Sequence, residues 1–265
     1  MFDWLAYDFM RTALWAVLLL VPLLSLLGTL VVNNKMSFFS DALGHSALTG
    51  VAIGVIAGVS EYRLVMVLFG VVFALCMNRI RRSRIASTDT VIGVFSSVGV
   101  ALGLTLLSAR GNLANYQSLL VGDILSITRD ELWVLAGALM VTALLWLFCF
   151  NGFFAVSVSP SVAKSKGFRS ALYDNLFVVL VAVVVMLAIR WVGLLLINAM
   201  LILPAAASRN VARNMRAYHL LSLIFGLFAG VLGLWLSYYN GVATGPTIIL
   251  VLAAVFFGTF LLRKK

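Results

Sequence analysis

The chain has 265 residues, of which 63% are hydrophobic and 11% are charged, and its mean hydropathy is +1.11. Soluble domains are about half apolar and about a quarter charged, so this composition excludes a soluble globular protein and indicates a polytopic membrane protein. The formal net charge is +10, but the basic residues stand in short clusters between apolar runs, which argues against a nucleic-acid-binding face.

Apolar runs along the chain predict an all-α, polytopic transmembrane helical bundle of eight or nine spans. A helix needs about 20 apolar residues to cross the hydrocarbon core. The predicted spans are residues 12–32, 42–58, 62–79, 90–108, 132–151, 173–190, 191–207, 218–238 and 246–262. The sixth and seventh share a very short joint at Arg190 and Trp191, and the count falls to eight if the first or the seventh does not cross. We expect residues 1–265 to form a single transmembrane domain.

Basic residues in the connections predict the orientation of the chain. If the carboxyl terminus lies inside, 14 of the 19 Lys and Arg residues fall on the inner side. The basic residues on the outer side are largely offset by acidic ones. Because cytoplasmic connections carry an excess of Lys and Arg, we place the carboxyl terminus in the cytoplasm.

Asp41 and His45 stand at the start of the second predicted span. A spacing of four residues brings two side chains to nearly the same face of a helix, one turn apart. Ionisable groups at membrane depth usually mark a pathway or a site, and a carboxylate with an imidazole suits manganese, iron or zinc. The alternatives are a helix N-cap for Asp41 and a packed core histidine for His45. We predict that the pair binds an ion.

Two ligands are too few for a closed metal site. If two copies of the chain face each other about a twofold axis, each gives one Asp and one His, and four ligands converge. A homodimer with the site on its axis follows as a hypothesis. Binding there must be moderate, because a transported ion has to leave.

Two connections are predicted to be more than hinges. Residues 109–130 are too short to span, which predicts an interfacial or re-entrant segment on the outer side. Residues 157–170 lie inside and predict a short helix, with Ser159 as N-cap, Pro160 in the first turn and Gly167 as the stop. Basic residues flank this helix, which suits docking to another protein.

The late spans contain three further residues of interest. Pro204 is predicted to kink or end its helix, and Asn198 precedes it. A packing role with a cross-helix hydrogen bond and a direct role in an ion pathway both stay open for these two residues. His219 lies at an inner boundary, where we expect a solvated interfacial histidine.

Motifs for enzymatic chemistry are missing from the sequence. It contains no Gly-x-x-x-x-Gly-Lys-Ser/Thr loop, no His-Glu-x-x-His motif and no exposed-serine elbow. We therefore expect no enzyme activity and no bound cofactor in this chain.

Two long segments of the sequence resemble a known family. They are Lys35 to Ser46, which reads KMSFFSDALGHS, and Gly193 to Ser208, which reads GLLLINAMLILPAAAS. Both are similar to signature segments of the membrane permeases of bacterial zinc, manganese and iron ABC importers. Gly122-Asp123-Ile124-Leu125 and Gly245-Pro246 also stand where that family has them, so the resemblance covers nearly the whole chain.

The resemblance implies a multi-pass permease subunit of the bacterial inner membrane that works as a homodimer. It implies a separate cytoplasmic ATPase subunit, an extracytoplasmic metal-binding protein and surrounding membrane lipid as partners, with zinc, manganese or iron as cargo. It also implies a metal waypoint at Asp41 and His45 and a coupling segment toward the ATPase. The coupling segment comprises Ser159, Pro160, Ser161, Val162, Ala163, Lys164, Ser165, Lys166 and Gly167. Many relatives carry an acid after the Pro, which this segment lacks.

Two other functions stay open at this point. An ion-gradient-driven carrier would use Asp41 to take up protons and would need no ATPase. A non-transporting membrane scaffold would use Asp41 and His45 only to bridge helices.

Overall fold

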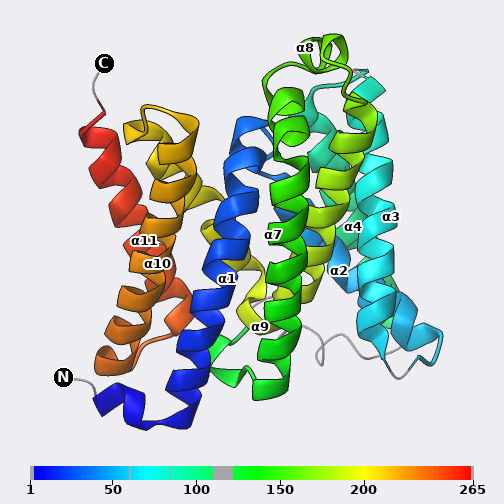
Figure 1. Ribbon diagram of the computed structural model, residues 1–265. Coiled ribbons are helices and arrows are strands. Elements are labelled where there is room, and N and C mark those ends of the chain that lie inside the picture. The colour runs from blue at the N-terminus through cyan, green and yellow to red at the C-terminus, as the bar shows by residue number, and fades with distance from the viewer. Residues whose placement is uncertain (1–2, 60, 84, 110–121, 264–265) are drawn as a thin grey trace. The chain divides into compact units, whose positions relative to one another are not determined.

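The computed structural model describes residues 3–59, 61–83, 85–109 and 122–263, and over these residues the chain is helical, without strands (Figure 1). In chain order the elements are η1 (Asp3–Ala6), α1 (Asp8–Asn33), α2 (Phe39–Ile56), α3 (Tyr62–Ser83), α4 (Thr88–Ala109), η2 (Ile124–Ser126), α7 (Arg129–Val158), α8 (Pro160–Ser165), α9 (Ser170–Val211), α10 (Met215–Asn240) and α11 (Thr244–Leu261). The predicted all-α class is confirmed. Most of the predicted outer segment at 109–130 lies outside the described residues.

In the described part of the chain, 8 helices are long and apolar enough to cross a membrane. The sixth and seventh predicted spans both lie in α9, which has 42 residues. A straight helix of that length would measure roughly 60 Å, about twice the hydrocarbon thickness. Gly193 interrupts α9 with φ 76° and ψ 162°, which are not helical angles. The joint between the two predicted spans therefore lies at Gly193, not at Arg190 and Trp191.

Contacts divide the chain into two compact units, whose boundaries fall near the end of α1 and within α7 and α9. Unit 1 contains Met1–Val32, Asp123–Phe148 and Leu195–Lys265, and unit 2 contains Asn33–Gly122 and Cys149–Leu194. The single domain expected over 1–265 stays a prediction.

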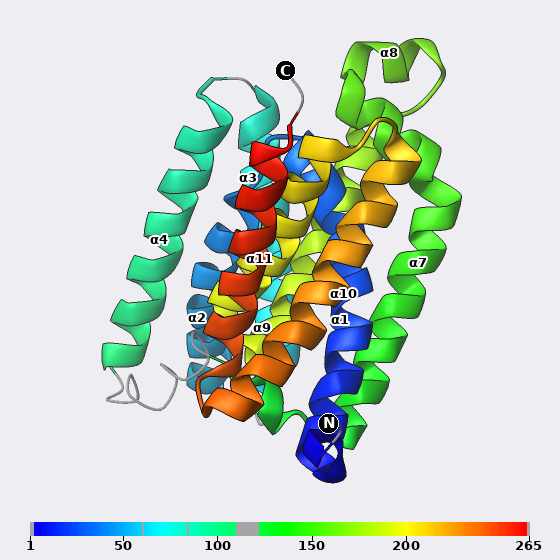
Figure 2. The same ribbon diagram turned by 90° about the vertical axis from the view of Figure 1, so that its left-hand side faces the viewer.

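In unit 1, small residues let helices approach closely. A Cβ added to Gly28 of α1 would lie 1.9 Å from the carbonyl oxygen of Leu201 in α9. Helices α10 and α11 run side by side (Figure 2), and the hydroxyls of Ser237 and Thr244 are 2.8 Å apart where the two helices join. Such contacts matter because lipid tails are as apolar as the helices and leave no hydrophobic force to drive helix association.

In unit 2, α2 is the helix around which α3 and α4 pack. The Thr49 hydroxyl donates a hydrogen bond of 2.6 Å to the Gly99 carbonyl of α4. A Cβ on Gly103 would lie 2.8 Å from the Leu48 Cβ, and one on Gly50 would lie 2.8 Å from the Met66 Cα of α3. This close packing covers most of α2, so the polar side chains at its start are held on a fixed backbone.

Candidate functional site

Asp41 and His45 lie on one edge of α2. The His45 Nε2 is 3.5 Å from the Asp41 Oδ2, and the two side chains are 32% and 39% exposed respectively. Their neighbours on the helix, including Ala42, Leu43 and Ser46, are fully buried. The helix thus presents a carboxylate and an imidazole together while its other faces pack against protein. Among the described residues, no group of three or more His, Cys, Asp or Glu side chains gathers to hold a metal ion.

A cavity of about 270 Å³ opens beside Asp41 and is lined by α2 and α4. Asp89, in the first turn of α4, faces the same cavity, with Ser96 and Ser97 further along that helix. The cavity therefore carries two carboxylates and two hydroxyls, all of them oxygen groups that divalent cations accept. An acid before an apolar run is typical of an ordinary helix start, so Asp89 could not be singled out from the sequence.

The predicted cytoplasmic helix is α8, a short helix that lies beyond the end of α7 (Figure 1). Pro160 stands in its first turn and Gly167, with φ 80°, follows its end, as the sequence predicted. Ser159 is the N-cap residue, but its side chain makes no capping hydrogen bond and instead lies 2.8 Å from the Ser161 hydroxyl. Ala163 is fully buried, whereas Val162 is exposed. One apolar side chain of α8 thus anchors the helix and another faces outward.

Aromatic rings fix the chain that leaves α8. The Phe168 amide donates to the Ala163 carbonyl at 3.0 Å, and the Phe168 ring meets Tyr173 edge-on at 5.6 Å. Tyr173 also packs edge-on against Phe153 of α7. Gly152 makes room for this ring, since a Cβ there would lie 2.2 Å from Tyr173. These contacts hold α8 against the ends of α7 and α9 within unit 2.

A polar network joins the end of α3 to the start of α9, close to the connection that contains α8. Arg81 donates to both carboxylate oxygens of Asp174 at 2.8 Å, and the two side chains are only 14% and 12% exposed. Arg81 also donates to the side-chain oxygen Oδ1 of Asn78. The side-chain Nδ2 of Asn78 in turn donates to Asn175 Oδ1 at 2.8 Å. A bidentate arginine–carboxylate pair is geometrically specific, so this network fixes how the inner ends of the two helices sit. From the sequence, Arg81 is only one of the 14 basic residues expected on the inner side.

A cavity of about 770 Å³ borders α8 and this network. Its basic lining residues are Lys35, Arg81, Arg82 and Lys164, against the single carboxylate of Asp174. The inner connections of unit 2 therefore form a positively charged recess next to the exposed face of α8. Such a surface suits an acidic protein partner.

Pro204 and Asn198 lie in the second part of α9. The helix continues through Pro204 to Val211, so Pro204 does not end it, and the alternative of a kink at Pro204 stays a prediction. Helices in lipid keep their backbone bonds because no water replaces them, and prolines are tolerated there. A Cβ added to Gly226 of α10 would lie 3.6 Å from the Pro204 ring, which places this proline in helix packing.

The break at Gly193 has its own packing partner. A Cβ on Gly122, whose φ is 60°, would lie 2.0 Å from the backbone nitrogen of Gly193. The backbone after the outer connection therefore lies directly on the interruption of α9. Two segments that carried the resemblance, one beginning at Gly122 and one at Gly193, meet at this point.

His219 differs from its prediction. Both its ring nitrogens are shielded from solvent, and the ring packs edge-on against Trp146 at 5.5 Å. It is a packed side chain between α10 and α7, not a solvated one.

Fold and site together define a polytopic membrane transport protein, with an ionisable pair on a packed helix and a short helix exposed beside a basic recess. The model of the ABC 3 transport family matches residues 6–263. The chain belongs to this family, and it is a multi-pass protein of the bacterial inner membrane.

Individual relatives agree with this assignment over nearly the full length. The chain is 30% identical over 98% of its length to the manganese import system permease protein ScaB of Streptococcus gordonii, of which 93% is covered. It is 29% identical over 98% of its length to the high-affinity zinc uptake system membrane protein ZnuB of Haemophilus influenzae, of which 99% is covered. The solved structure of PsaBC from Streptococcus pneumoniae in complex with Fab matches with a TM-score of 0.83 and 31% identity, covering 96% of this chain and 91% of that one.

Proposed function

We propose that this chain is the permease subunit of an ATP-driven importer of divalent transition metal ions, with Asp41 and His45 as the metal waypoint. The observation that carries this proposal is the 3.5 Å approach of His45 Nε2 to Asp41 Oδ2 on a helix whose other faces are packed. Relatives named for manganese import and zinc uptake support the cargo class. A carboxylate with an imidazole accepts manganese, zinc and iron, so the pair by itself does not choose among them.

The waypoint is proposed to be shared by two copies of the chain. One copy supplies two ligands, and no third His, Cys, Asp or Glu joins them among the described residues. A twofold axis beside α2 would bring a second Asp41 and His45 to the same ion. The resulting four-ligand set matches the coordination number that zinc takes in proteins. The ion is cargo, and no resident cofactor is proposed.

The energy source is proposed to be a separate cytoplasmic ATPase subunit that docks on α8, and an extracytoplasmic metal-binding protein is proposed to deliver the ion. The exposed Val162 and the basic recess beside α8 support the first partner. In this arrangement the segment from Ser159 to Gly167 transmits movement of the ATPase to α7 and α9, because Ala163 is buried and the Phe168 that follows the segment packs on Tyr173 of α9.

Uptake of radiolabelled manganese and zinc tests the waypoint in cells that lack their own importer and produce the full transporter. Asp41→Asn and His45→Ala should each lower the initial rate about tenfold or more, because each removes a metal ligand. Asp130→Asn, which removes an exposed carboxylate at the start of α7, is the matched control and should stay within about twofold of the unchanged protein.

Membrane levels of each variant are measured in parallel, so that loss of protein is separated from loss of transport. Normal uptake by both waypoint variants at equal protein levels would overturn the assignment. Uptake that persists when the ATPase is inactivated would instead favour an ion-gradient carrier.

A further inference from the structure

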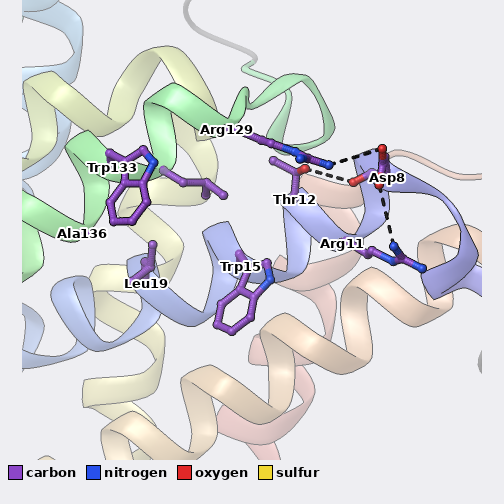
Figure 3. Close-up of a pocket in the computed structure, with 9 residues that line it drawn as sticks. Asp8, Arg11, Thr12, Trp15, Leu19, Arg129, Trp133 and Ala136 are labelled. Carbon is purple, nitrogen blue, oxygen red and sulfur yellow. Dashed lines mark hydrogen bonds and ion pairs between the residues drawn. The ribbon is translucent and has the colours of Figure 1, made fainter.

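A groove of about 530 Å³ runs between α1 and the start of α7 (Figure 3), and none of its lining residues belongs to the proposed waypoint. Both helix segments belong to unit 1. The groove is lined by two kinds of side chain. The polar lining residues are Asp8, Arg11, Thr12 and Arg129, and the apolar ones are Trp15, Leu19, Leu132, Trp133 and Ala136.

The polar residues form one ion-paired cluster at one end of the groove, as Figure 3 shows. The Arg129 Nη2 is 3.4 Å from one carboxylate oxygen of Asp8, and the Arg11 Nη1 is 3.8 Å from the other. Two guanidinium groups thus share one carboxylate, which leaves the cluster with a formal charge of +1. Each guanidinium has five N–H donors, so donors remain for a further anion.

The apolar residues lie progressively deeper along both helices. On α1, Arg11 is followed one turn later by Trp15 and two turns later by Leu19. On α7, Arg129 is followed by Trp133 and Ala136. The groove therefore passes from charged to aromatic to aliphatic lining over about two helical turns.

That gradient matches the depth profile of a bilayer leaflet. Tryptophan is enriched at the level of the headgroups, and purely apolar side chains lie below it. Trp15 and Trp133 are 60% and 79% exposed, so their rings are available to an occupant of the groove. By the predicted orientation Arg11 and Arg129 lie on the outer side, which places the cluster at the outer leaflet.

We propose that this groove is a binding site for an anionic phospholipid of the outer leaflet. The phosphate group would accept hydrogen bonds from Arg11 and Arg129, and one acyl chain would lie along Trp15, Leu19 and Trp133. A single phosphodiester charge neutralises the +1 of the cluster, whereas a zwitterionic headgroup brings its own cation against the two arginines. Basic pockets between helices on the cytoplasmic side of membranes bind anionic headgroups, and the same charge complementarity is proposed here for the outer leaflet.

Quenching of tryptophan fluorescence by brominated lipids tests the proposal on the full chain in vesicles. Bromine on an acyl chain quenches only nearby rings, so Trp15 and Trp133 report the occupant of the groove. Their part of the signal is the part that disappears in the Trp15→Phe/Trp133→Phe double variant. We expect brominated phosphatidylglycerol, at a low fraction in phosphatidylcholine, to quench this signal at least threefold more than the same fraction of brominated phosphatidylcholine.

Charge variants then test whether the arginines bind a lipid or only pair with Asp8 to hold α1 against α7. Arg11→Gln/Arg129→Gln should abolish the threefold preference, and Asp8→Asn should increase it, since the cluster then carries +2. Arg63→Gln, which removes an exposed arginine paired with Glu61 outside the groove, should leave the preference unchanged.

Three results would overturn the proposal. Equal quenching by both lipids would mean that the groove meets only bulk lipid. A preference that survives the double arginine variant would place the anion site elsewhere. Rings that neither lipid quenches would mean that protein, such as a second copy or a partner, fills the groove.

Discussion

At the scale of single residues, loss of the Arg81–Asp174 pair should cost more stability than loss of an exposed ion pair. Its side chains are 14% and 12% exposed, so removing one partner leaves a poorly hydrated charge. Breaking a buried ion pair costs about 3 to 5 kcal/mol, whereas an exposed pair contributes at most about 1 kcal/mol.

We expect Asp174→Asn to lower the melting temperature of the purified protein clearly, because Arg81 loses its bidentate acceptor. Glu61→Gln breaks the exposed pair of Arg63 and Glu61 and should shift the melting temperature little. Thermal unfolding in detergent, followed by circular dichroism, measures both variants. Equal melting temperatures for the two would show that the Arg81 network does not hold α3 against α9.

The pairing of Asp41 with His45 could be predicted from the sequence, because a spacing of four on a helix fixes which side chains share an edge. Asp174 could not be predicted as the partner of Arg81, since the two lie 93 residues apart and only packing brings them together. Asp89 resembles an ordinary helix-start acid in the sequence, and its position beside Asp41 depends in addition on how α4 packs on α2.

At the scale of elements, the interruption of α9 at Gly193 shapes the late part of the chain. Its φ of 76° and ψ of 162° lie in a region that is essentially restricted to glycine, and a side chain there costs about 1 to 3 kcal/mol. Gly122 lies against it with no room for a Cβ. The sequence predicted the joint between the sixth and seventh spans at Arg190 and Trp191, close to Gly193. It could not place the joint at Gly193, because apolar content alone does not reveal backbone angles.

Gly193→Ala should therefore lower both the melting temperature and the transport rate. Gly258→Ala is the matched control, because that glycine lies in α11 with open space around its Cα, and alanine is the better helix former. The same thermal unfolding assay compares the two. A Gly193→Ala protein as stable as the Gly258→Ala protein would contradict the strained angles assigned to Gly193.

Helix α8 is the element through which the proposed ATPase would act. Val162→Asp places a charge on its exposed face while the buried Ala163 anchor stays in place, so we expect transport to fall with little change in stability. Ile85→Asp, at an exposed apolar residue before α4, is the control and should transport normally. Metal uptake and ATP hydrolysis by the assembled transporter measure the effect. If ATP hydrolysis drives uptake in Val162→Asp as well as in the unchanged protein, α8 does not take part in the mechanism.

At the scale of the whole molecule, the sequence predicted the all-α class, the run of spans and the short helix that became α8, because these depend on apolar length and on local turn residues. It left open whether Pro204 kinks or ends its helix, and it did not predict that His219 packs against Trp146. Both depend on neighbouring helices, which replace water around proline and histidine in a membrane.

The central claim is that two chains share one metal ion through Asp41 and His45. Zinc titration of the assembled, purified transporter by calorimetry tests it most directly, with Asp130→Asn as the matched control. We expect one ion bound for every two permease chains in the unchanged protein and in Asp130→Asn, and none at that site in Asp41→Asn/His45→Ala. One ion per chain, or the same stoichiometry and affinity in the double variant, would contradict it.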